Sequence, residues 1–171
     1  MKTFTKIMLG ANAVIASLTV VKAIRTANAV KKAEVLVIGG HTVKVDKYGF
    51  MKSAHAAVAM VAEMKDTGKY QIFVDESFLS LDKDVQLAIL AHEDGHIKLG
   101  HLENVGALNA YKRAIESLKG AQKIELEADA YAATVVGVDS MIKALEALMA
   151  LDIPLNKREI DYRIKTLKGE V

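Results

Sequence analysis

Two histidines, His92 and His96, stand four residues apart in a stretch whose apolar residues recur at helical spacing. Residues four apart lie on one face of a helix, so both imidazoles can reach a single ion. Val85, Ala88 and Ile89 fall on the same face, which directs the histidines toward the protein interior. Because buried polar rings need partners, the segment predicts a core helix built around a metal site.

The rest of the composition narrows the chemistry of such a site. The chain has 171 residues, 51% of them apolar, which suits one domain with a single core. It has no cysteine, so thiolate ligands and disulfides are excluded and a metal must be held by His, Asp or Glu. The net charge is only +2 and aromatic residues make up 5%, so we expect no nucleic-acid partner.

Glu93 follows His92 directly and completes the pattern His-Glu-x-x-His. Catalytic zinc accepts neutral imidazoles and keeps one position open for water. Glu93 projects about 100° around the helix from His92, beside that open position. A carboxylate there can take a proton from metal-bound water as it attacks a carbonyl, and then pass it to the leaving amine. The pattern predicts a zinc-dependent endopeptidase, a hydrolase with polypeptide as its substrate.

A second acidic motif can supply the third protein ligand that catalytic zinc needs. Glu125 and Asp129 are four apart on a second expected helix, and Glu127 falls on its opposite side. We expect Glu125 to bind the metal. Asp129 would accept the spare N–H of a ligand histidine and fix its tautomer.

These motifs resemble those of the gluzincin metallopeptidases, and most closely the HtpX-like and CAAX-prenyl-protease-like membrane metalloendopeptidases. The resemblance spans about Tyr70 to Leu167 and implies a zincin-like fold, with a small sheet over the active-site helix followed by a helical half. It also implies Glu125 as third ligand and Asp129 as its supporting residue. The matching segments are His92-Glu93-Asp94-Gly95-His96-Ile97, Gly100-His101, and Glu125-Leu126-Glu127-Ala128-Asp129 with Ala132.

The chain departs from that family in ways that leave some roles open. Asp94 stands where the family usually has an apolar residue, and its charge could alter access or metal affinity. Arg163 or Tyr162 could polarise the scissile carbonyl, with a structural ion pair as the alternative for Arg163. His101 lies about 140° around the helix from His96, so we expect it to cap the helix end or contact a ligand, not to bind metal.

Strand patterns come early in the chain and helix patterns late, which predicts an α+β fold with a small mixed sheet. The strand Tyr70–Val74 would lie near the active-site helix, and an extended substrate could pair with its residues Gln71–Val74 if it were an edge. A hairpin is expected from Glu34–Ile38 and Thr42–Val45, and a helix at Ser53–Lys65. Further helices are expected from Asp82 or Asp84 to about Leu102, and at Val105–Leu118, Ala121–Val136, Ser140–Leu151 (capped by Asp139) and Lys157–Leu167.

Residues 1–33 differ from the peptidase-like region 34–171, because they carry no acidic residue and an uncharged apolar run between lysines. Residues 4–24 could form a membrane anchor, a cleaved signal peptide or a packed amphipathic helix. If they span a membrane, the more basic later flank favours a cytoplasmic catalytic domain. Signal cleavage would instead give a secreted or periplasmic protein.

A rival function uses the same metal site without catalysis. The protein would then be a zinc-stabilised structural or interaction module. The presence of Glu93 argues against this alternative, because a purely structural site needs no general base.

Overall fold

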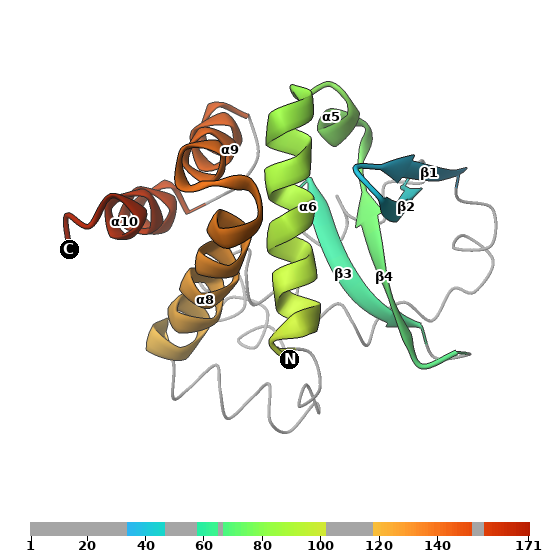
Figure 1. The fold of residues 1–171 in the computed structure, drawn as a ribbon, viewed down its shortest axis with the longest axis horizontal. Coiled ribbons are helices and arrows are strands. Elements are labelled where there is room, and N and C mark those ends of the chain that lie inside the picture. The colour runs from blue at the N-terminus through green and yellow to red at the C-terminus, as the bar shows by residue number, and fades with distance from the viewer. Residues whose placement is uncertain (1–33, 47–57, 65–66, 102–117, 152–155) are drawn as a thin grey trace, which may run out of the picture.

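The computed structural model describes residues 34–46, 58–64, 67–101, 118–151 and 156–171. The N-terminal apolar segment and nearly all of the helix expected at Val105–Leu118 lie outside these ranges. Helix α6 (Lys83–Lys98) runs through the middle of the molecule, with the sheet on one side and helices α8, α9 and α10 on the other (Figure 1). The mixed α+β class expected from the sequence is confirmed.

The described strands form a four-stranded sheet in the order β1-β2-β4-β3. β1 (Glu34–Ile38) and β2 (His41–Val45) make the expected hairpin, turning through Gly39 and Gly40, both at positive φ. β2 pairs parallel with β4 (Lys69–Val74), and β4 pairs antiparallel with β3 (Ala59–Met64). The sheet is therefore mixed, as the sequence predicts.

Two expectations about this sheet are wrong. The helix predicted at Ser53–Lys65 is contradicted by β3, because pairing with β4 overrides the helix preference of its Ala and Met residues. The strand Gln71–Val74 is not an edge, since β4 lies between β2 and β3. Its last three residues, from Ile72 on, are all buried, as expected of a strand covered on both faces. Among the described strands, the free edges belong to β1 and β3.

Helix α6 ends at Lys98, four residues earlier than expected, because Gly100 takes a left-handed conformation with φ 67°. The N–H of His101 donates to the carbonyl of His96 at 3.0 Å, and the N–H of Gly100 to that of Ile97 at 3.2 Å. This pattern is a Schellman motif, which turns the chain back beneath the last turn of the helix. At the other end of α6, the short helix α5 (Glu76–Leu79) is capped by Asp75.

The helical half contains α8 (Leu118–Val136), α9 (Val138–Ala150) and α10 (Lys157–Lys168). Asp139 does not cap α9 as predicted. The cap is Gly137, whose φ of 90° joins α8 to α9 with no other residue between them, so Asp139 lies in the first turn. α10 is capped by the side chain of Asn156, which accepts from the N–H of Glu159.

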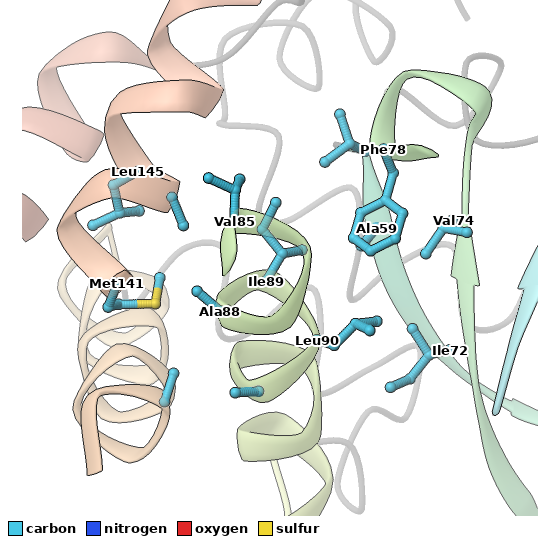
Figure 2. Close-up of a cluster of buried hydrophobic side chains, with 14 of the residues drawn as sticks. Ala59, Ile72, Val74, Phe78, Val85, Ala88, Ile89, Leu90, Met141 and Leu145 are labelled. Atoms are coloured by element: carbon cyan, nitrogen blue, oxygen red, sulfur yellow. The ribbon is translucent and has the colours of Figure 1, made fainter. Parts of the chain in front are cut away.

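The core lies on both sides of α6 (Figure 2). Leu90 points toward Ile72 of the sheet, while Met141 and Leu145 of α9 lie on the side of Ala88. All five are buried. Such two-sided packing fixes the rotation of α6, and so decides which way its histidines face.

Within the described parts of the chain, no helix has both the length and the apolar character to cross a bilayer. Residues 4–24, on which the membrane hypothesis rests, lie outside those parts.

Candidate metal centre

Three buried side chains from two helices converge at one point. The Nε2 atoms of His92 and His96 lie 3.1 Å apart. Nε2 of His92 is 3.4 Å from Oε2 of Glu125, and Nε2 of His96 is 3.4 Å from Oε1 of the same carboxylate. The histidines are each 8% exposed and Glu125 is 6% exposed. This group can hold a metal ion.

Gly95 brings the helix that carries Glu125 within reach of the histidines. A Cβ at this position would lie 3.1 Å from Cδ1 of Tyr131 and 3.2 Å from the carbonyl oxygen of Ala128. α6 and α8 therefore touch through backbone at Gly95, one residue before His96. The close approach sets the separation between the two histidines and Glu125.

His92 is backed by a buried charge pair. Its Nδ1 lies 2.8 Å from Oδ1 of Asp129, which is fully buried. An ionised carboxylate only accepts hydrogen bonds, so Nδ1 of His92 carries a proton, and Nε2 is the atom that faces His96 and Glu125. Arg163 of α10 donates to Asp129 through Nε at 2.7 Å and Nη2 at 2.6 Å, and to Glu125 through Nη1 at 3.0 Å.

His96 is backed by a second imidazole. Its Nδ1 lies 3.0 Å from Nδ1 of His101, which is itself buried. Nε2 of His101 lies 3.3 Å from Oε2 of Glu127, a side chain that is 44% exposed. Lys123 in turn lies 3.5 Å from the other carboxylate oxygen of Glu127. A line of polar contacts thus runs from His96 to the protein surface.

The donor atoms fit a metal ion closely. Ligand atoms about 2.0–2.1 Å from a tetrahedral ion lie roughly 3.3 Å from one another, close to the observed 3.1 and 3.4 Å. The two nitrogen atoms and the two carboxylate oxygens are electron-rich, and at such distances they repel one another unless a proton or a cation lies among them. The charge agrees, because the carboxylates of Glu125 and Asp129 exceed the single guanidinium of Arg163 by one negative charge, and Glu93 can add another.

The pKa values of the site show the same preference for positive charge. Burial acts to lower the pKa of His92, but hydrogen bonds to Asp129 and Glu125 outweigh it and raise the pKa to about 10. Burial acts to raise the pKa values of Glu125 and Asp129, yet the Arg163 guanidinium and the neighbouring histidines hold both below their usual range. Both carboxylates are therefore ionised at neutral pH and attract a cation.

The two acidic residues that follow His92 in α6, Glu93 and Asp94, have different surroundings. Glu93 is half-buried, and its carboxyl interacts electrostatically with His92, His96 and Glu125. Burial raises the pKa of Glu93, with repulsion from Glu125 adding to it. Asp94 faces elsewhere, since its Oδ2 accepts a hydrogen bond from the hydroxyl of Tyr131 at 3.0 Å.

The two candidates for polarising a carbonyl differ in position. Arg163 is 7% exposed and uses all three of its nitrogen atoms on the carboxylates of Asp129 and Glu125. This geometry supports the ion-pair alternative for Arg163. Tyr162 is 39% exposed. His101 contacts the ring of His96, which is one of the two roles expected for it from the sequence, and the left-handed Gly100 turns the chain toward that ring.

Comparisons of the chain with protein-family models, with curated proteins and with solved structures found no match.

Proposed function

We propose that this protein is a zinc-dependent endopeptidase with a zincin-like catalytic domain. The observation that carries the proposal is the buried triangle of His92, His96 and Glu125 with the carboxyl of Glu93 beside it. Two imidazoles and one carboxylate form a ligand set typical of catalytic zinc, which leaves a fourth position open. Since the chain has no cysteine, the closed thiolate sites of structural zinc are not available to it.

Each residue of the site has a separate role in the proposed reaction. His92, His96 and Glu125 would hold the ion, which supplies Lewis-acid polarisation and makes water more acidic. Glu93 takes a proton from the attacking water and delivers it to the leaving amine. Its raised pKa suits that exchange, because a general base works best when its pKa is near the working pH. Asp129 and Arg163 keep the ligands in position.

An extended polypeptide would bind along β3. This strand packs against α6 and pairs only with β4 among the described strands. Its free edge therefore presents backbone donors and acceptors near the active-site helix, where a substrate strand can add to the sheet. β3 replaces the Gln71–Val74 segment in this role.

The test is metal analysis of the purified protein combined with digestion of casein or a peptide library. Glu93→Gln should retain about one zinc per chain and lose at least ~10²-fold in turnover, because it removes the base and keeps the ligands. Asp94→Asn is a matched control, since its carboxylate is bound to Tyr131 away from the ligands. Turnover of that variant should be unchanged.

The same experiment distinguishes the proposal from the rival function. A zinc-stabilised module without catalysis would bind one zinc and cleave nothing, and Glu93→Gln would then change neither property. Normal cleavage by Glu93→Gln would also contradict the proposal.

A further inference from the structure

We propose that His101 and Glu127 are positioning residues that fix the tautomer of the metal ligand His96. The inference rests on the proposed zinc site. His101 and Glu127 would support His96 as Asp129 supports His92. Among the interactions of the described residues, neither Asp129 nor Arg163 contacts the ring of His96.

The proton positions on the rings of His101 and His96 follow from the contact of His101 with Glu127. Glu127 is a carboxylate and can only accept, so it selects the Nε2–H form of His101. The Nδ1 atom of a neutral His101 then has a lone pair. Nδ1 of His96, 3.0 Å away, must be the donor in that contact. With its proton on Nδ1, His96 presents the lone pair of Nε2 to the metal.

The contact between the two rings requires a neutral His101. A protonated His101 would have no lone pair on Nδ1 and could not accept from His96. The neutral form is the one that serves as acceptor.

The local fold brings His101 into place at little cost. The left-handed conformation of Gly100 folds the chain under α6, and the backbone N–H of His101 donates to the carbonyl of His96 itself. His101 thus contacts His96 twice, backbone to backbone and ring to ring. The His96 ring is held at both ends, by the metal site and by His101.

The test compares zinc affinity, by chelator competition, in the wild type and three His101 or Glu127 variants. His101→Leu keeps the bulk but removes the acceptor, and should weaken zinc binding by roughly 10-fold. His101→Asn places an amide oxygen where Nδ1 stands, and should recover affinity to within ~3-fold of wild type. Glu127→Ala should weaken binding by no more than ~3-fold, because water can replace a half-exposed carboxylate.

Two further measurements separate positioning from simple packing. In the His101→Leu background, Glu127→Ala should have no additional effect, because it acts only through the ring. Long-range nitrogen–proton spectra of the zinc-loaded protein should show His96 protonated at Nδ1 in the wild type and in His101→Asn. Lys123→Ala is the control for the surface, and should leave zinc affinity unchanged although it removes a contact to Glu127.

The outcomes distinguish the inference from the proposed function. A wild-type protein that binds no zinc would overturn both. A wild type that binds zinc, with His101→Leu binding equally tightly, would overturn the positioning role alone. Failure of His101→Asn to recover affinity would also overturn it, because bulk and not the acceptor would then be the relevant property.

Discussion

The two histidines of α6 approach the same point, but the groups behind them differ. Behind His92 stands Asp129, which is fully buried and held by the guanidinium of Arg163. Behind His96 stands a neutral imidazole, His101, whose own partner Glu127 is 44% exposed. A charged acceptor binds an imidazole N–H more strongly than a neutral one does. The His92 side should therefore contribute more to metal binding and to fold stability than the His96 side.

Removing Asp129 should have the largest effect of any change behind the ligands. Asp129→Ala leaves Glu125 as the hydrogen-bond partner of the buried Arg163 guanidinium among the described residues, and losing one partner of a buried pair costs about 3–5 kcal/mol. Denaturant unfolding of the metal-free protein should register this loss. Zinc affinity should fall by ~100-fold, the upper end for a supporting residue.

Glu125→Ala is the reference for this comparison, since it deletes a ligand and should weaken zinc binding further still. Asp129→Ala should in turn exceed His101→Leu in both stability and affinity. Equal or reversed effects would mean that the charge on Asp129 does not distinguish the two sides.

The pH dependence of the metal-free protein should also distinguish the sides. The pKa of His92 rises from its ordinary 6.5 to about 10 on folding, so its stabilising contribution is complete below about 6.5 and is lost as pH rises toward 10. The lowered pKa values of Glu125 and Asp129 have the opposite sign, and their contribution is lost as pH falls below their ordinary 4.5 and 3.8. The stabilising contributions of these three groups are therefore all present together between about pH 4.5 and 6.5.

Unfolding measured across pH 5 to 10 checks this expectation. Asp129→Asn should flatten most of the fall above pH 6.5, because it removes the main partner of the charged His92. His101→Leu should keep that fall. If the fall in stability disappeared in His101→Leu and persisted in Asp129→Asn, the titrating group would be on the His96 side, and the expectation for His92 would be wrong.

Gly95→Ala should produce the smallest of these effects and act on both sides alike. The new Cβ would lie 3.1–3.3 Å from Tyr131 and the backbone of Ala128, so α8 must shift by a few tenths of an ångström. Overpacking of about 1–3 kcal/mol is offset by a gain of roughly 1 kcal/mol in helix propensity. We expect a net loss of about 1 kcal/mol in unfolding and a ~3-fold lower zinc affinity.

The sequence predicts the local features of the site and not the contacts between distant elements. The face of α6, the spacing of Glu125 and Asp129, and the position of α8 all follow from helical periodicity, which is local. The contact of Asp129 with a ligand histidine was expected from spacing and is present at 2.8 Å. The choice of Arg163 as the partner of Asp129 was not accessible, because it depends on how α10 packs, 34 residues further on.

The errors have local causes as well. A helix continued to Leu102 would have carried His101 away from His96, and only the left-handed Gly100 reverses the chain. β3 was predicted as a helix since Ala57, Val58, Val61 and Met64 also match helical spacing. Strand order is a property of the whole sheet, so the central place of β4 could be suspected only from its unbroken Ile-Phe-Val run.

The reach of Arg163 across the site has a consequence for how the protein is made. Glu125 and Asp129 precede Arg163 by 38 and 34 residues, so translation delivers both carboxylates well before their counter-charge. During that interval the two carboxylates repel one another, and α8 lacks the tie that orients them toward α6. Ion uptake by a nascent chain would therefore be loose and exchangeable. On the proposed zinc site, tight binding would require α10 to have docked, so that Arg163 holds both carboxylates.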